Sequence, residues 1–96
     1  MQYAKNLIEV QIHQSYENFK IAEKQLEIYK SVLGEADKIV ADELANYKNG
    51  KTTFLDLSES HRKQDEVYSG YFRALKTYIY SLIELEDDIG IWDIDF

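Results

Sequence analysis

The sequence contains one clear turn signal, Tyr47-Lys48-Asn49-Gly50-Lys51-Thr52-Thr53-Phe54-Leu55-Asp56. Asparagine and glycine tolerate a left-handed backbone, which the residue after a helix often adopts, so Gly50 is predicted to follow the end of a first helix. Thr52 or Thr53 is then expected to cap a second helix, with Asp56 in its first turn, where the helix dipole favours an acid. The stretch therefore predicts a hairpin of two helices.

A long helix-period pattern precedes this turn. Apolar residues recur at alternating steps of three and four, with polar lapses only at Ser15 and Glu43. This seam comprises Ile8, Ile12, Ser15, Phe19, Ala22, Leu26, Tyr29, Leu33, Ala36, Val40, Glu43 and Tyr47. A second apolar line beside it comprises Ile21, Ile28, Val32 and Ile39. Because one partner helix needs only one narrow seam, the second line predicts contact with a further neighbour.

The pattern after the turn runs to Gly90, and its predicted seam comprises Phe54, Leu57, His61, Gln64, Tyr68, Tyr71, Leu75, Tyr78, Leu82, Leu85 and Ile89. Residues 58–66 carry no large apolar side chain, so this part is expected to be wet or packed through polar groups. Acids near the C-terminal end oppose the helix dipole, so fraying is expected near Asp88, with residues 91–96 as a short extended tail.

The fold predicted for residues 1–96 is all-α, a single long antiparallel two-helix coiled-coil hairpin. Its helices are expected at about residues 3–48 and 53–89, with no sheet. The absence of proline permits long uninterrupted helices, and eight tyrosines favour half-buried helix faces that keep the hydroxyl groups wet.

Composition bounds the function. The chain has 96 residues, enough for one small domain, and a net charge of −7 from 18 acidic and 11 basic residues. Such a charge argues against binding nucleic acid or anionic membranes. The sequence has no cysteine, which excludes disulfides and thiol catalysis, and no apolar stretch approaches the roughly 20 residues of a membrane-spanning helix.

Candidate chemistry is sparse. His61 with Asp65, and His13 with Glu17, are spaced i, i+4 on a helix face and could contribute metal ligands, but such pairs arise easily in a chain rich in charge. The Glu-x-x-His pairs of carboxylate-bridged metal bundles do not occur, and no nucleophile or phosphate-loop signature is present. We therefore expect no catalytic residue, no cofactor, no metal and no enzymatic activity.

Asp56 and Glu59 are spaced i, i+3 in the first turns of the second helix. One interpretation is that they complement the positive N-terminal end of that helix. The other is that copies of both acids form rings at one end of an oligomeric bundle and act on cations electrostatically. The residues alone favour the first interpretation.

Two motifs carry a resemblance. Tyr47-x-x-Gly50 followed by Thr53-Phe54-Leu55-Asp56-Leu57, and later Tyr78-x-x-Ser81-Leu82-x-x-Leu85-Glu86-x-x-Ile89-Gly90, resemble the second, C-terminal periplasmic helical hairpin of the outer-membrane efflux (TolC) family. The resemblance extends from about Ile8 to Gly90. It implies that the chain is a fragment of a larger channel protein, a homotrimer that passes small molecules or proteins through a periplasmic α-helical tunnel without a catalytic step.

The resemblance also implies roles for residues near the turn. The tip that closes the entrance and meets a periplasmic adaptor protein and inner-membrane pump would comprise Tyr47, Asn49, Gly50, Lys51, Thr52 and Thr53. Asp56 and Glu59 match the acids that line the entrance. The chain departs from the best-known member at Lys51 and Thr52, where that member has threonine and arginine, and at Ser58 and Ser60, where the family often has leucine and alanine.

The pattern alone fits a second function equally well, a stand-alone coiled-coil interaction module that dimerises into a four-helix bundle. A metal-binding enzyme is a third, weaker alternative. In either of the first two cases the second apolar line of the first helix leaves apolar area uncovered in a monomer, so the isolated chain is expected to self-associate.

Overall fold

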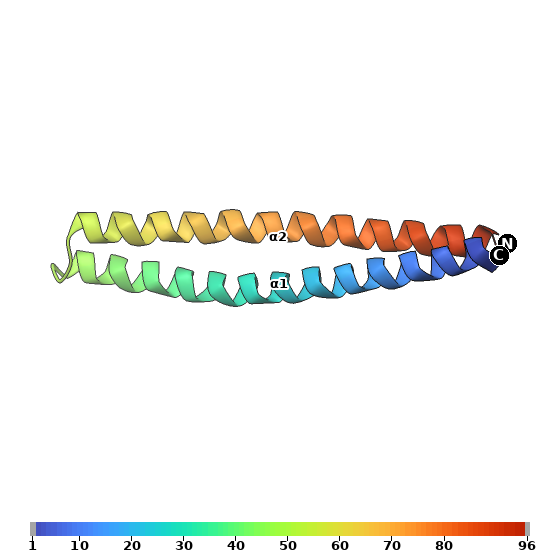
Figure 1. The fold of residues 1–96 in the computed structure, drawn as a ribbon. Coiled ribbons are helices and arrows are strands. Elements are labelled where there is room, and N and C mark those ends of the chain that lie inside the picture. The colour runs from blue at the N-terminus through green and yellow to red at the C-terminus, as the bar shows by residue number, and fades with distance from the viewer. Residues whose placement is uncertain (1, 96) are drawn as a thin grey trace. The chain divides into compact units, whose positions relative to one another are not determined.

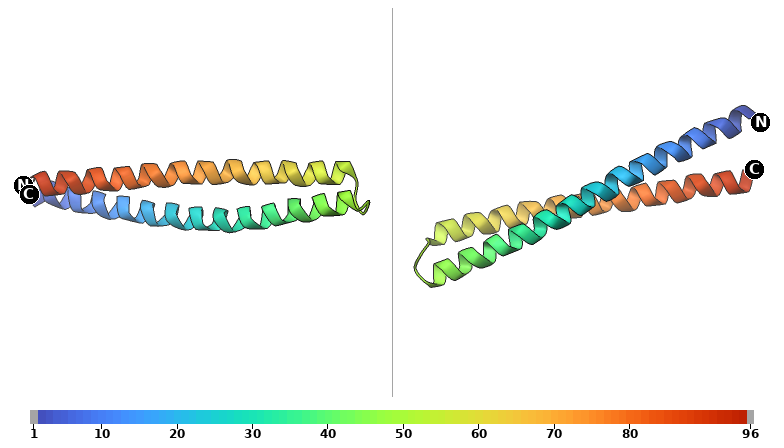
Figure 2. Two further views of the ribbon diagram at one scale, coloured as in Figure 1. Left: turned by 180° about the vertical axis from the view of Figure 1, so that it is seen from behind. Right: turned by 90° about the horizontal axis from the view of Figure 1, so that it is seen from below.

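The computed structural model describes the backbone of residues 2–95 and the side chains of residues 4–91. It contains two helices, α1 (Gln2–Lys48) and α2 (Phe54–Asp95), and no strand within residues 2–95. The two helices run in opposite directions on either side of one turn (Figures 1 and 2). The predicted all-α helical hairpin is confirmed.

The chain divides into two compact units, each built from one segment of α1 and one of α2. The terminal unit comprises Met1–Leu26 and Ala74–Phe96, and the turn unit comprises Glu27–Arg73. Figure 2 shows that the connecting turn lies at one end of the turn unit.

The end of α1 is closed by a hydrogen-bonded glycine cap. Gly50 has a φ of 72°, and its N–H donates to the carbonyl oxygen of Tyr47 at 3.1 Å. The N–H of Lys51 donates to the carbonyl oxygen of Asn46 at 2.8 Å. These two bonds define the Schellman motif, which satisfies carbonyl groups that the helix end would otherwise leave unpaired. The predicted position of Gly50 after the first helix is confirmed.

The start of α2 is capped by Thr53 rather than by Thr52. Thr53 Oγ1 accepts a hydrogen bond from the backbone N–H of Asp56 at 3.1 Å, the usual geometry of an N-cap threonine. The hydroxyl of Thr52 lies 3.3 Å from Glu43 Oε2 on α1 and 3.1 Å from Asp56 Oδ2. Because a hydroxyl has a single proton, Thr52 donates to one carboxylate at a time. Both threonines therefore contribute to closing the turn.

The terminal unit contains every side chain between residues 4 and 91 that is buried. They are Ser15, Ala22, Leu26, Ala74, Leu85 and Asp88. Four of the six are small or polar, and Phe19 and Tyr78 add a tilted ring contact with centroids 5.3 Å apart. The buried set therefore combines small and polar side chains with two leucines.

The turn unit holds its helices together differently. Gly70 is buried against the ring of Tyr29, and a Cβ atom at Gly70 would lie 2.6 Å from Tyr29 Cε1. Farther toward the turn, Asp37 on α1 accepts hydrogen bonds from Gln64 Nε2 at 2.9 Å and from the Tyr68 hydroxyl at 3.1 Å. The expected polar packing near residues 58–66 is thus found at Gln64.

Two predictions for α2 were wrong. The tail expected at residues 91–96 is helical through Asp95, while Phe96 lies outside the described residues. A glycine inside a helix costs only about 1 kcal/mol, so Gly90 does not stop α2. Asp88, expected near a frayed end, is 7% exposed and accepts a hydrogen bond from the Ser15 hydroxyl on α1.

The predicted seam of α2 also needs correction. Ala74 and Asp88 are buried, whereas Phe54, His61 and Ile89 of the predicted seam are exposed. At residues 74 and 88 the buried position lies one residue before the predicted one, whereas Thr53, which precedes Phe54, is exposed as well. Small side chains allow closer approach of the two backbones, so the helices meet along Ala74 rather than along the larger Leu75 beside it.

Candidate functional site

An exposed apolar surface marks the turn end of the hairpin. Tyr47 at the end of α1 and Phe54 at the start of α2 meet edge to face, with ring centroids 6.1 Å apart. Both rings remain exposed, and neighbouring Leu55 is 75% exposed. Because large apolar side chains gathered at the surface usually mark a contact site, this tip cluster of Tyr47, Phe54 and Leu55 is the first candidate for recognition.

An apolar groove lies next to the tip cluster in the turn unit. Its volume is about 370 Å³, and it is lined by Val40, Leu44, Phe54, Leu57, Ser58 and His61. Only Ser58 and His61 contribute polar side chains, and His61 Nδ1 lies 3.6 Å from Asp65 Oδ2 on its own helix. A groove of this kind suits the apolar side chains of another helix better than a polar small molecule.

The residues predicted to form the docking tip lie together in one turn. Asn49 and Lys51 are exposed, while Gly50 and Thr53 act through the helix caps described above. The structure thus brings the tip residues together, and their hydrogen bonds close the turn. Whether they meet an adaptor protein stays a prediction.

The two predicted entrance acids lie on the exposed surface of α2. Asp56 is bonded within the turn, whereas Glu59 pairs with Arg62, whose Nη2 lies 2.5 Å from Glu59 Oε1. The hydrogen bond and the charge of Arg62 lower the pKa of Glu59 from its ordinary value. Arg62 also pairs with Glu66, and both carboxylates raise the pKa of the guanidinium. Glu59 is therefore ionised, but part of its charge is balanced within α2.

Sequence reasoning missed the polar bonds that α1 makes with α2 and with the turn. They join Ser15 to Asp88, Glu43 to Thr52, and Asp37 to Gln64 and Tyr68. The bond to Asp37 raises the pKa of the Tyr68 hydroxyl, because ionised tyrosine could no longer donate it. A signal was present in the sequence, since the two polar lapses of the α1 seam, Ser15 and Glu43, both turn out to make such bonds.

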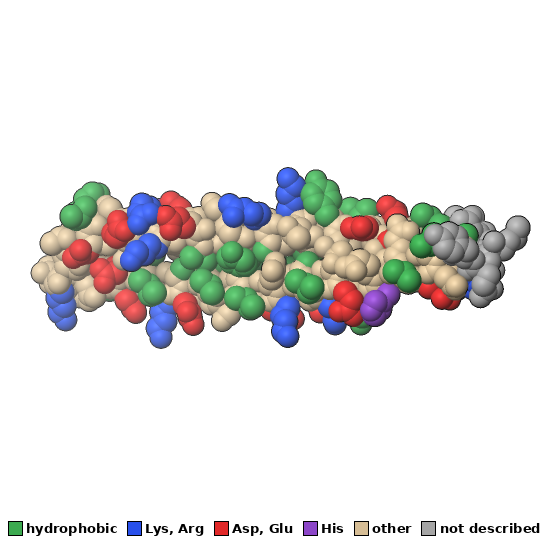
Figure 3. Space-filling view, viewed as in Figure 1, with side chains coloured by type: hydrophobic (Ala, Val, Ile, Leu, Met, Phe, Trp, Pro, Cys, Tyr) green, Lys and Arg blue, Asp and Glu red, His purple; other side chains and the backbone are tan. Residues whose placement is uncertain are grey.

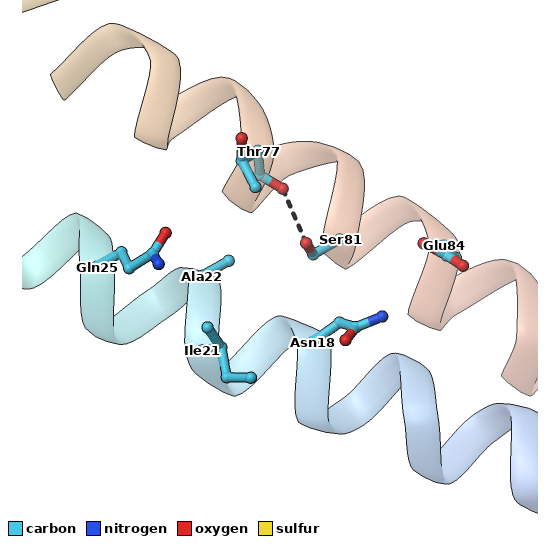
Figure 4. Close-up of a pocket in the computed structure, with 7 residues that line it drawn as sticks. All are labelled: Asn18, Ile21, Ala22, Gln25, Thr77, Ser81 and Glu84. Atoms are coloured by element: carbon cyan, nitrogen blue, oxygen red, sulfur yellow. Dashed lines mark hydrogen bonds between the residues drawn. The ribbon is translucent and has the colours of Figure 1, made fainter. Parts of the chain in front are cut away.

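A second groove lies in the terminal unit (Figure 4). It has a volume of about 310 Å³ and is lined by Asn18, Ile21, Ala22, Gln25, Thr77, Ser81 and Glu84. Its α2 wall carries only polar side chains, and the Ser81 hydroxyl donates to the carbonyl oxygen of Thr77 at 2.8 Å. The groove is mixed in polarity and carries no cluster of groups that would act together in catalysis.

The second apolar line of α1 is uncovered. Ile21, Ile28 and Ile39 are each more than half exposed, and Val32 is 36% exposed. We call these four residues the α1 stripe. Figure 3 shows hydrophobic side chains at the surface of α1 between charged ones. The predicted second line is therefore exposed in the single chain, as expected for a surface that needs another neighbour.

No protein-family model, curated protein or solved structure matches this chain. Within the described residues, no three His, Asp or Glu side chains gather in a way that would hold a metal ion. In the same part of the chain, neither helix has a segment long and apolar enough to cross a bilayer. Any assignment of function therefore depends on the tip, the grooves and the α1 stripe.

Proposed function

We propose that the chain is a helical hairpin from the periplasmic tunnel of an outer-membrane efflux or secretion channel. The turn is its docking tip, and the helices form part of the tunnel wall. The full-length protein is a homotrimer that works with a periplasmic adaptor protein and an inner-membrane pump. The hairpin takes part as a passive conduit and carries out no catalytic step.

The observation that carries this proposal is the position of the tip motif. Tyr47, Gly50, Thr53 and Asp56 form the turn of a hairpin, and they do so with the glycine cap and threonine cap that a sharp reversal needs. The same turn exposes the rings of Tyr47 and Phe54. A tip that is stable as a turn yet apolar at its surface is suited to meeting another protein end on.

Exposed area supports a role inside an assembly. The chain exposes 7191 Å² of surface, whereas a compact protein of 11.3 kDa exposes about 5,700 Å². The surplus of roughly 1,500 Å² is about twice the roughly 800 Å² that each partner buries in a standard protein interface. The α1 stripe supplies apolar residues for such an interface, and neighbouring hairpins in a tunnel wall would cover it.

Gating in this proposal is an opening of the tip. The turn unit buries no described side chain and its helices are joined partly by polar bonds, so opening it costs less apolar burial than opening the terminal unit. Asp56 and Glu59 would line the closed entrance and attract cations. An adaptor protein docking at Gly50 and Lys51 would shift the population toward the open entrance.

Conductance of the full-length protein in a planar bilayer tests this proposal. The double variant Asp56→Asn/Glu59→Gln is expected to weaken block by multivalent cations, while the matched double variant Glu86→Gln/Asp87→Asn, at exposed positions farther along the same helix, leaves the block unchanged. A channel whose block is unaffected by the first variant would contradict the role of the two acids. A full-length protein without any conductance would contradict the channel itself.

A second candidate function is a stand-alone coiled-coil module that dimerises into a four-helix bundle. The surplus of exposed area and the α1 stripe favour it equally, because a second copy could cover both. The two candidates differ in what they assemble into. A discrete soluble dimer formed by the full-length protein would favour the module, and a membrane-inserted trimer would favour the channel.

A further inference from the structure

The turn contains a reactive dipeptide, Asn49-Gly50, whose chemical reactivity plays no part in the proposed function. Asn49 is exposed and is the only one of the four asparagines that glycine follows. Asparagine is among the chemically labile residues, and a following glycine removes the side chain that would hinder attack on the amide. We infer that the cap of α1 protects Asn49 from deamidation, so that Asn49 reacts only when the last turn of α1 opens.

The reaction requires the backbone nitrogen of Gly50. After losing its proton to solvent, this nitrogen attacks Cγ of Asn49, and the side-chain amide group leaves as ammonia. Water then opens the cyclic imide at either carbonyl and leaves an aspartate or an isoaspartate at position 49. A water molecule is consumed and ammonia is released, and no oxidant or reductant takes part.

The folded turn opposes this reaction in two ways. The N–H of Gly50 donates to the carbonyl oxygen of Tyr47 at 3.1 Å, so the attacking nitrogen is held as a hydrogen-bond donor. The N–H groups of Asn49 and Lys51 donate to the carbonyl oxygens of Ala45 and Asn46, which fixes the backbone on both sides. Ring closure needs Asn49 to rotate its backbone toward Cγ, and that rotation breaks these bonds.

The product would weaken the cap that protects the starting side chain. A carboxylate at position 49 adds negative charge at the C-terminal end of α1, where the helix dipole disfavours it. An isoaspartate also lengthens the main chain by one carbon between Lys48 and Gly50. The bond from Lys51 N–H to the carbonyl oxygen of Asn46 spans that point and cannot keep its geometry. Modification therefore opens the tip permanently.

Peptide-mapping mass spectrometry of the full chain tests the inference. Chemistry on a transiently opened segment follows the population of the open form, so conversion at Asn49 is expected to be at least about tenfold slower in buffer than in denaturing urea at the same pH and temperature. Equal rates in the two solutions would overturn the inference. An Asn49→Gln chain, which should show no conversion in this peptide, controls the assignment of the site.

A pair of matched variants separates opening of the cap from general loss of stability. Ala45→Gly weakens the last turn of α1, and the same exchange at exposed Ala4 weakens the other end. Conversion at Asn49 in buffer is expected to be several-fold faster in Ala45→Gly than in Ala4→Gly, with equal rates in urea. Equal rates of both variants in buffer would show that the cap does not control the reaction. This outcome is independent of the channel proposal.

Discussion

The terminal unit and the turn unit contain the same two helices but are held together in different ways. The terminal unit buries Leu26 and Leu85 and pairs Ser15 with Asp88 between its helices. The turn unit buries no described side chain. Asp37 and the close approach at Gly70 join α1 to α2, and Glu43 joins α1 to Thr52 in the turn. One coiled-coil pattern therefore supports two kinds of contact between the helices, buried side chains in the terminal unit and mainly polar bonds in the turn unit.

This difference suggests a division of labour. Buried apolar side chains stabilise the terminal unit, and their loss would be costly. Polar bonds at the surface contribute little net free energy, since water replaces them when they break. The turn unit is thus the part of the hairpin that can open at low cost, which is what a docking or gating tip requires.

The largest expected effect is loss of a buried leucine. Leu26→Ala removes a buried side chain from the terminal unit and is expected to lower the free energy of unfolding by about 2–4 kcal/mol. Leu44→Ala in the turn unit removes a side chain that is 41% exposed and should cost less than about 1 kcal/mol. Urea unfolding followed by circular dichroism measures both. Equal losses would contradict the contrast between the units.

The buried polar pair gives the next effect. Ser15→Ala removes the hydroxyl that donates to buried Asp88 and is expected to cost about 1–3 kcal/mol, because the carboxylate loses its partner. Ser31→Ala, at an exposed position of α1, is the matched control and should have almost no effect. The double variant Ser15→Ala/Asp88→Leu should recover most of the loss. A double variant less stable than Ser15→Ala would show that Asp88 stabilises the fold through more than its hydrogen bond with Ser15.

Two glycine variants sharpen the account of the turn unit. Gly34 has open space around it, so Gly34→Ala should stabilise the hairpin by about 0.5–1 kcal/mol through helix propensity. At Gly70 the same gain is opposed by overlap with the Tyr29 ring, which costs about 1–3 kcal/mol when packed groups must move. Gly70→Ala is therefore expected to destabilise. Thermal melting of both variants tests the sign, and two stabilised variants would mean that the Tyr29 contact is loose.

The smallest expected effect concerns Glu59 and pH. Arg62 lowers the pKa of Glu59 in the folded chain, so the pair stabilises the fold above the ordinary glutamate range and loses this effect as pH falls through the lowered pKa. In Arg62→Ala the pKa of Glu59 should rise toward its ordinary value. An NMR titration of the Glu59 carboxyl measures the shift, and Lys24→Ala, at an exposed position of α1, provides a control of equal charge change. An unchanged pKa of Glu59 in Arg62→Ala would show that Arg62 is not the cause of the lowered pKa.

The fold could be predicted from the sequence because its determinants are local. The heptad steps, the Asn49-Gly50 pair and the absence of proline fixed two helices and one turn, and the cap at Gly50 formed as expected. The exposure of the α1 stripe, from Ile21 to Ile39, also followed from counting seams. These features depend on residues close in sequence or on one face of one helix.

Other features could not be read from the pattern. The line of contact on α2 depends on which side chains of the two helices are buried together, and small Ala22 on α1 and Ala74 on α2 are both buried. The burial of Asp88 likewise requires a donor, Ser15, that is far away in sequence. A periodicity taken one helix at a time contains no information on such pairs, so the seam was misplaced and Asp88 was expected at a frayed end.

The central claim is that the α1 stripe is an assembly surface, and sedimentation of the isolated chain tests it most directly. The unmodified chain is expected to self-associate with rising concentration. Ile21→Gln/Ile28→Gln is expected to remain monomeric, because polar side chains remove the apolar contact. Lys24→Gln/Lys38→Gln, at exposed positions of α1 outside the stripe, should associate as the unmodified chain does. A strictly monomeric unmodified chain at high concentration would contradict the claim.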